Sequence, residues 1–333
     1  MSARIKRDLY AAVGNTPLIR IPKLSEAIGR TILGKAEHLN PGGSVKDRAA
    51  KFIIEDAEAS GRLKPGGTIV EGTAGNTGIA LALLGNAHGY HSIIVVPDDQ
   101  SPEKFDLLRV FGADVRAVPY APFADPNNYY HVAKRIAEST PNSIWADQFN
   151  NLANKRAHFE TTGPEIWNET GGSVDAFVAA AGTGGTIAGV AAALKQRNPK
   201  IRAVLADPMG SSLYSYIKCG TLDFEGDSIT EGIGIKRVTD NFKDALVDDA
   251  LRVDDRATVE MAHYLLHEEG LLLGSSAALN VTAAARVAKE LPAGSTVVTV
   301  LCDGGARAMS RLYNDAWLAE NELKPTARSL EFL

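Results

Sequence analysis

The sequence lacks the features that are typical of disulfide-rich, metal-binding, nucleic-acid-binding and membrane-spanning proteins. Only two cysteines occur, Cys219 and Cys302, and their spacing suits neither a metal site nor a disulfide framework, so we predict no metal and a reducing compartment. There is no long Lys/Arg run, and the formal net charge is −5, which gives nucleic acid no support as a partner. No apolar stretch reaches the length of a membrane span, and the N-terminal residues show no secretory signal. We therefore expect a cytoplasmic protein.

What is present is a regular alternation of short apolar runs and helical patterns. The runs are apolar at nearly every position, which is typical of strands that lie in a parallel sheet covered by helices. Repeated strand–helix units predict an α/β protein with right-handed crossovers. The expected strands span 68–72, 91–97, 114–119, 176–181, 201–207 and 295–302.

A polar, irregular passage at 146–167 interrupts this alternation and predicts a domain boundary. We expect two domains, each a mostly parallel twisted sheet covered by helices. The smaller would comprise 1–11 and 35–145, and the larger 12–34 and 146–333, with approximate boundaries. Ligands of such folds bind at the C-terminal ends of the strands, here in the cleft between the domains.

One glycine-rich turn has the features of a phosphate site. The sequence "AAAGTGGTIAG" leads from an expected strand into a helix through Gly182, Thr183, Gly184, Gly185 and Thr186. Small residues let backbone N–H groups approach an anion at the positive end of the helix. A plain tight turn is an equally good interpretation. A dinucleotide site is supported only weakly, by Asp207 near the required distance, so a single phosphate fits better.

A second turn, "EGTAGNTGIALA", is rich in hydrogen-bonding groups. Thr73, Gly75, Asn76 and Thr77 lie between an expected strand and a helix. Asn76 or Thr77 alone can be read as an N-cap. A cap needs only one such residue, however, and a carboxylate held by backbone N–H groups and hydroxyls would use several.

The third feature is a lysine at an unfavourable position. In "NPGGSVKDRAA" the turn 40–43 is followed by Ser44, a plausible cap, and then by Lys46, where the helix dipole repels a positive charge. An arbitrary lysine of this kind is a surface residue. Beside a phosphate turn and a carboxylate turn, a reactive amine instead suggests pyridoxal phosphate held as a Schiff base.

The order of these motifs resembles the cysteine synthase (O-acetylserine sulfhydrylase) family, within the tryptophan synthase β-like, fold type II group of pyridoxal-phosphate enzymes. The resemblance covers nearly the whole chain. It rests on "VGNTPLIRI", "NPGGSVKDRAA", "EGTAGNTGIALA", "DQFNNLANKRAH", "GTGGTIAG" and "EGIG", in the family's order.

The resemblance implies a role for each matching residue. Lys46 would bind the cofactor covalently and move the α-proton, and Asn76 would contact the cofactor's ring hydroxyl. The phosphate would be held by Gly182, Thr183, Gly184, Gly185 and Thr186. Gly232 would approach the cofactor with its backbone, where a side chain would intrude. The substrate carboxylate would be bound by Thr73, Ala74, Gly75, Thr77 and Gln148.

The sequence departs from the family pattern after the last expected strand. Family members present Ser or Thr to the pyridine nitrogen there, whereas this chain has Gly304, with Asp303 beside it. If Asp303 turned inward, its charge would favour a protonated ring. We expect instead that it points away and caps the next helix.

By resemblance, the reaction is a β-replacement that makes L-cysteine from O-acetyl-L-serine and sulfide through an α-aminoacrylate. Two related activities stay open, L-cysteine desulfhydrase and a cystathionine β-synthase-like reaction with homocysteine. An alternative of another class is a non-catalytic relative that binds a ligand or partner protein, but such a protein would not need the amine of Lys46. A nucleotide-binding oxidoreductase has still less support from the sequence. The resemblance also implies a homodimer and, for some members, docking of the C-terminal tail of serine acetyltransferase.

Overall fold

The chain folds into two compact units, each built on its own sheet. The computed structural model describes residues 5–73, 75–98, 102–326 and 329–333. One unit comprises residues 1–14 and 40–157, and the other 15–39 and 158–333. Both are α/β units with mostly parallel sheets covered by helices, so the predicted fold class is confirmed. No helix in the described part of the chain is long and apolar enough to cross a membrane.

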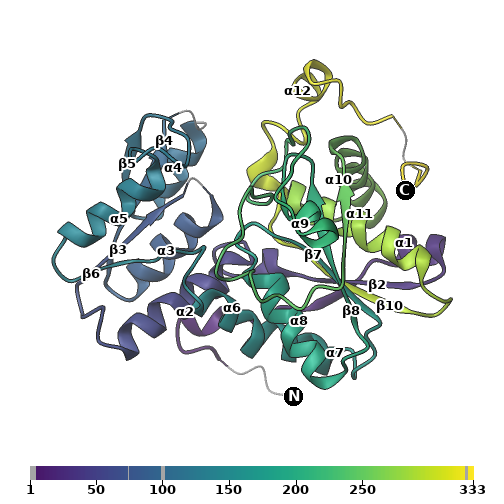
Figure 1. Ribbon diagram of the computed structural model, residues 1–333, viewed down its shortest axis with the longest axis horizontal. Helices are drawn as coiled ribbons and strands as arrows, with labels where there is room; N and C mark the ends of the chain where they lie inside the picture. Colours follow the sequence, from purple (N-terminus) through teal and green to yellow (C-terminus); the bar gives the residue numbers. More distant parts are fainter. Residues whose placement is uncertain (1–4, 74, 99–101, 327–328) are drawn as a thin grey trace. The chain divides into compact units, whose positions relative to one another are not determined.

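The first unit contains a four-stranded parallel sheet in the order β5-β4-β3-β6 (Figure 1). β3 and β4 are buried along almost their whole length, as a continuous apolar run predicts, whereas β5 is an edge strand with exposed positions. The strands are β3 (Thr68–Gly72), β4 (His91–Pro97), β5 (Asp114–Val118) and β6 (Ser143–Trp145). The helices are η1 (Tyr10–Ala12), α2 (Lys46–Ala59), α3 (Asn76–Ala87), α4 (Pro102–Val110), α5 (Tyr129–Ser139) and α6 (Ala153–Ala157).

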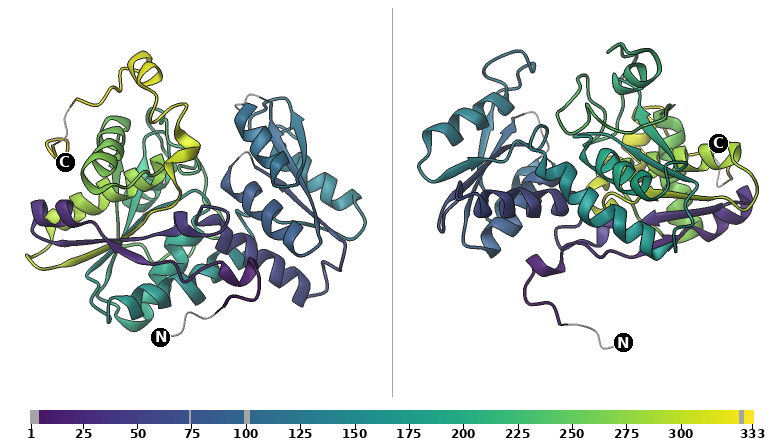
Figure 2. Two further views of the ribbon diagram at one scale, coloured as in Figure 1. Left: turned by 180° about the vertical axis from the view of Figure 1, so that it is seen from behind. Right: turned by 60° about the horizontal axis from the view of Figure 1, so that its bottom comes forward.

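The second unit contains a six-stranded sheet in the order β1-β2-β10-β7-β8-β9, in which only the edge pair β1–β2 is antiparallel. Figure 2 shows the ribbon from two further sides. Its strands are β1 (Leu18–Arg20), β2 (Thr31–Lys35), β7 (Ala176–Ala180), β8 (Arg202–Pro208), β9 (Asp249–Val253) and β10 (Thr296–Val300). Its helical segments are α1 (Pro22–Ile28), η2 (Glu37–Leu39), the π-helix η3 (His158–Thr162), α7 (Gly163–Glu169), α8 (Gly185–Arg197), α9 (Leu213–Cys219), α10 (Asp255–Glu269), α11 (Ser275–Glu290), η4 (Gly305–Ala308) and α12 (Asp315–Glu320).

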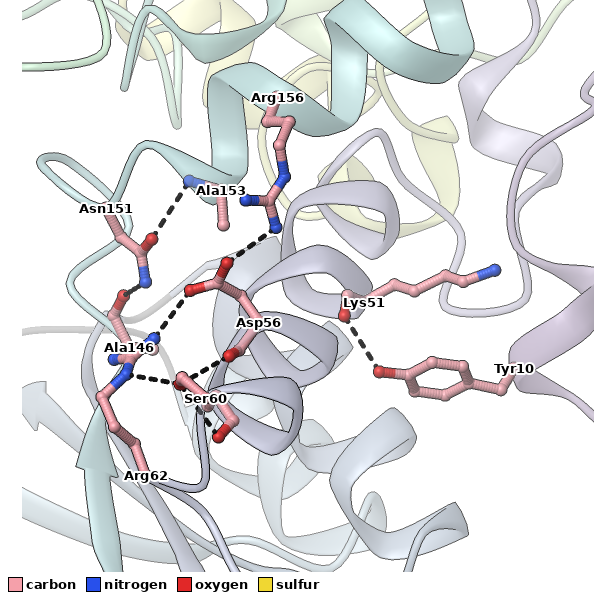
Figure 3. A network of polar contacts seen from close by, with 10 residues as sticks. Tyr10, Lys51, Asp56, Ser60, Arg62, Ala146, Asn151, Ala153 and Arg156 are labelled. Atoms are coloured by element: carbon pink, nitrogen blue, oxygen red, sulfur yellow. Dashed lines mark hydrogen bonds and ion pairs between the residues drawn. The ribbon is translucent and has the colours of Figure 1, made fainter.

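The units divide the chain at residues other than those expected from the sequence. The sequence-based division placed 146–157 in the larger domain, but these residues belong to the first unit because α6 packs against α2. Figure 3 shows the polar contacts of this packing: Arg156 of α6 binds the carboxylate of Asp56 on α2 at 2.8 Å. Residues 12–14 also lie in the first unit, and 35–39 in the second.

Helix α11 is the centre of the second unit and fixes the strand ends that precede the candidate site. Its face is rich in alanine, and it packs against β7, β10 and α10. Asn280 on this helix is fully buried; its Oδ1 accepts the N–H of Ala180 at 2.7 Å, and its Nδ2 donates to the carbonyl of Val300 at 2.9 Å. One side chain thus satisfies backbone groups at the C-terminal ends of two strands.

We expect Asn280→Leu to lower the free energy of unfolding by about 2–4 kcal/mol, because it leaves two buried backbone groups without a partner. Asn321→Leu removes an exposed side-chain hydrogen bond and is expected to stay within about 0.5 kcal/mol of wild type. Urea denaturation of the apoprotein measures both. Equal effects would contradict the role given to Asn280.

Candidate active site

Lys46 is the first residue of α2, as the sequence suggested. The residue that precedes the helix is Val45, which provides no side-chain cap, and Ser44 accepts the N–H of Lys46 at 3.2 Å. Ser44 therefore supports the helix start from one position before the N-cap. The side chain of Lys46 is half-buried, and its ammonium group makes no hydrogen bond or ion pair with any residue that the structure describes.

The glycine turn before Lys46 is shaped by close contacts. Gly43 has φ +79°, a backbone conformation that glycine adopts without strain. A Cβ on Gly42 would lie 2.7 Å from the carboxylate of Asp47, which accepts the N–H of Gly42. The turn therefore requires small residues so that the buried carboxylate can approach its backbone.

The substrate turn joins β3 to α3 without a side-chain cap. Gly75 is the N-cap residue of α3, so neither Asn76 nor Thr77 caps the helix. The hydroxyl of Thr73 accepts the N–H of Gly75 at 3.2 Å, and Asn76 is half-buried at the first helical position. Ala74 lies outside the described residues. The first backbone N–H groups of α3 are thus not used by a capping side chain, an arrangement that suits a bound carboxylate.

The structure brings Gln148 to this turn. The hydroxyl of Thr77 donates to Gln148 Oε1 at 2.6 Å, although 71 residues separate them, and both side chains are buried. Gln148 follows β6, which pairs with β3, so the two residues meet at the same end of the sheet. These are two of the residues expected to bind the substrate carboxylate.

Sequence analysis overlooked Glu71, which lies just before this turn. Its side chain is fully buried, and Oε1 accepts from Gln148 Nε2 at 3.3 Å. Burial raises the pKa of Glu71 to about 8, and the negative charge of Asp147 acts in the same direction. The sequence feature that could have identified Glu71 is a single carboxylate in an otherwise apolar expected strand.

The phosphate turn in the second unit forms a tight cradle. Gly184, the N-cap residue of α8, has φ +83°, and no side chain caps the helix. A Cβ on Gly182 would lie 2.1 Å from the carbonyl oxygen of Gly232, so this position accepts only glycine without a shift of the backbone. The structure therefore brings Gly182 and Gly232 together. Thr183 Oγ1 accepts the N–H of Gly185 at 3.3 Å.

His158, which the sequence analysis also did not identify, lies behind the phosphate turn. This buried residue has Nε2 at 3.2 Å from Thr186 Oγ1 and Nδ1 at 2.9 Å from Thr162 Oγ1. The hydrogen bonds of its two ring nitrogens with Thr162 and Thr186 fix the plane of the imidazole ring. Since 28 residues separate His158 from Thr186, only the folded chain reveals the contact.

Gly304 and Asp303 lie beside the start of α11. Gly304 forms a bridge with Leu273, and a Cβ there would have no atom within 4 Å. Gly304 is the N-cap residue of η4 and makes no side-chain cap, while Asp303 Oδ1 lies 3.4 Å from Ser276 Oγ. The carboxylate of Asp303 thus contacts the beginning of the preceding helix, α11.

The phosphate turn of the second unit and Lys46 of the first unit are each of a kind that suits pyridoxal phosphate. The backbone of Gly232 approaches Gly182 too closely for any Cβ, and α8 begins after Gly184, which has no side chain to cap it, so its N-terminus offers backbone N–H groups and a positive dipole to a phosphate. The ammonium of Lys46 is the amine that a carbonyl cofactor requires. Among the described residues, no group of three or more His, Cys, Asp or Glu could hold a metal ion.

Comparison with known proteins agrees with this chemistry. The family described as pyridoxal-phosphate dependent enzymes matches residues 9–303. Cysteine synthase 1 of Neurospora crassa is 54% identical over 324 residues, covering 96% of this chain and 86% of that protein. The cysteine synthase of Dictyostelium discoideum is 47% identical, covering 96% and 87%.

Among solved structures, an O-acetylserine dependent cystathionine beta-synthase from Helicobacter pylori superposes with a TM-score of 0.83 at 36% identity, covering 92% of this chain and 98% of that one. The likeness extends over the whole fold in each of these comparisons. This chain therefore belongs to the pyridoxal-phosphate-dependent enzymes and, among them, to the cysteine synthase family.

Proposed function

We propose that this enzyme makes L-cysteine from O-acetyl-L-serine and sulfide by β-replacement, with pyridoxal phosphate as its cofactor. The observation that carries the proposal is Lys46, whose ammonium stands at an uncapped helix start without a partner among the described residues, in a chain of the cysteine synthase family. In the overall reaction the bond between the β-carbon and the acetoxy oxygen breaks, a C–S bond forms at the β-carbon, and the acetoxy group leaves as acetic acid.

When bound, pyridoxal phosphate withdraws electrons from the α-carbon of the amino acid, so that the α-proton becomes acidic and a group on the β-carbon can depart. Lys46 would hold the cofactor and later act as the general base and acid at the α-carbon. The turn 182–186 would hold the phosphate. Asn76 would bind the ring hydroxyl, Gly232 would present its backbone, and Gly304 would lie at the pyridine nitrogen.

The substrate's α-carboxylate would be held at the start of α3. Thr73, Gly75 and Thr77 supply backbone and hydroxyl groups there, and Gln148 supplies a carboxamide. By resemblance, Ala74 would take part as well. A carboxylate at an uncapped helix N-terminus satisfies N–H groups that no side chain uses. Closure of this turn over the carboxylate would keep water from the reacting carbons.

Three further properties belong to the same proposal. We expect a homodimer, a cytoplasmic location and docking of the C-terminal tail of serine acetyltransferase. We also propose that the first unit acts as the substrate-loop domain and the second as the phosphate-binding domain.

The function is tested by incubating the purified holoenzyme with O-acetyl-L-serine and either sulfide or L-homocysteine. We expect L-cysteine with sulfide, at a kcat/KM above that for cystathionine formation. The opposite preference would favour the reaction named for the Helicobacter protein. Release of sulfide from L-cysteine, without synthesis in the other direction, would identify a desulfhydrase.

Lys46→Ala is expected to abolish covalent attachment of pyridoxal phosphate and to lower kcat by about a thousandfold or more, because it removes both the anchor and the proton-transfer group. Borohydride reduction followed by peptide mass spectrometry locates the cofactor. Lys51→Ala is the matched control, since Lys51 lies on the same helix over the ring of Tyr10. Cofactor on another lysine in the wild type would overturn the assignment.

Gly182→Ala is expected to weaken pyridoxal phosphate binding about tenfold or more, because the new methyl group forces the carbonyl of Gly232 out of the cradle. Gly171→Ala is the control: Gly171 has φ +61°, but its Cβ would meet no atom within 4 Å. That change should cost stability without changing cofactor affinity. Fluorescence titration of the apoproteins measures both, and equal affinities for Gly182→Ala and wild type would contradict the phosphate assignment.

A further inference from the structure

Glu71 is a buried acid in a place where an apolar residue would suit the sheet. It is the fourth residue of β3, between the neighbouring strands β4 and β6, and its side chain is fully buried. Its Oε2 atom makes no hydrogen bond, and the carboxyl forms no ion pair, within the described part of the chain. Burying a polar group in this way opposes folding, so its presence is to be explained by what it contacts.

What Glu71 contacts is the segment that carries Gln148. The Gln148 side chain donates through Nε2 to Glu71 Oε1 at 3.3 Å. Asp147 has φ +44°, which an L-residue rarely adopts. On the other side, Asn154 Nδ2 donates to the Gln148 carbonyl at 2.9 Å. The segment is therefore held in one conformation from several directions.

Thr77 and Glu71 contact the two ends of the Gln148 carboxamide, and the structure has its oxygen toward Thr77 and its nitrogen toward Glu71. Its oxygen accepts the hydroxyl proton of Thr77 at 2.6 Å, while its nitrogen faces an acceptor on Glu71. A carboxamide held in this way can offer its second N–H to an anion. The carboxamide oxygen would repel an anion, and in this orientation it faces Thr77 instead.

We propose that Glu71 is a positioning residue that fixes the Gln148 carboxamide with its nitrogen as the donor to the substrate's α-carboxylate. The inference rests on the proposed function, which assigns Gln148 to that carboxylate. Because burial raises the pKa of Glu71 to about 8, the carboxyl is mostly protonated at neutral pH. Its carbonyl oxygen then accepts from Gln148 without a negative charge next to the incoming carboxylate.

The test compares Glu71→Leu with Glu71→Gln in the holoenzyme. Leucine removes the acceptor, so the KM for O-acetyl-L-serine should rise about tenfold while kcat changes little. Glutamine keeps a carbonyl oxygen, and its KM should lie near that of the wild type. The melting temperature of Glu71→Leu should be unchanged or higher, because a buried carboxyl is lost. A purely structural role predicts the reverse, a lower melting temperature and cofactor content with an unchanged KM.

A double-mutant cycle with Gln148→Ala tests the connection between the two residues. Gln148→Ala alone should raise the KM, and Glu71→Leu should raise it no further in the Gln148→Ala background, because the group that Glu71 positions is absent. Independent effects that multiply in the double variant would overturn the proposal.

Binding of L-alanine, which has an α-carboxylate but no β-leaving group, separates this inference from the proposed function. The change in visible absorbance of the bound cofactor gives the Kd. If wild type binds L-alanine and Glu71→Leu weakens that binding while Glu71→Gln does not, the inference holds even if O-acetyl-L-serine and sulfide give no cysteine. Equal Kd values for wild type and Glu71→Leu would overturn the inference alone. A wild type that neither binds L-alanine nor uses O-acetyl-L-serine would overturn both.

Discussion

The proposed site depends on helix starts at which the N-cap residue itself offers no side-chain acceptor to the first backbone N–H groups. Helices α2, α3 and α8 begin after Val45, Gly75 and Gly184, none of which provides a side-chain cap. Three other helices have side-chain caps, since Asn128, Asp254 and Asn314 accept N–H groups at the starts of α5, α10 and α12. Helices α1, α7, α9 and α11 also begin without a side-chain cap from the N-cap residue. A helix start without a side-chain cap loses some stability, but it offers donors and a positive dipole to an anion. The same device serves the proposed carboxylate in one unit and the proposed phosphate in the other.

Rigid surroundings hold these helix starts in place. In the second unit Asn280 fixes the ends of β7 and β10, and the carbonyl of Gly232 closes against Gly182. In the first unit the hydroxyl of Thr77 and the carboxyl of Glu71 hold Gln148 from its two ends. Buried polar groups of this kind contribute less to stability than apolar packing does, and their value lies in the single geometry that they impose.

The sequence predicted the strands and the turns that carry the site, because both are local features. Continuous apolar runs indicated β3, β4, β7, β8 and β10, and glycine after an apolar run indicated the turns at 73–77 and 182–186. It did not predict contacts that depend on the packing of distant segments. Glu71 meets Gln148 across 77 residues, His158 meets Thr186, and Arg156 of α6 binds Asp56, so that α6 joins the first unit. The alternative interpretation of Asn76 or Thr77 as an N-cap does not hold, because Gly75 is the N-cap residue and both side chains belong to the helix.

The central proposal is that Lys46 binds a carbonyl cofactor and that two helix starts, one in each unit, bind the phosphate of that cofactor and the carboxylate of an amino acid. The visible absorption spectrum of the purified protein tests it most directly, recorded alone, after O-acetyl-L-serine, and again after sulfide. The account predicts a yellow protein whose band shifts when the amino acid is added and returns when sulfide follows. A protein that stays colourless after addition of pyridoxal phosphate would contradict it.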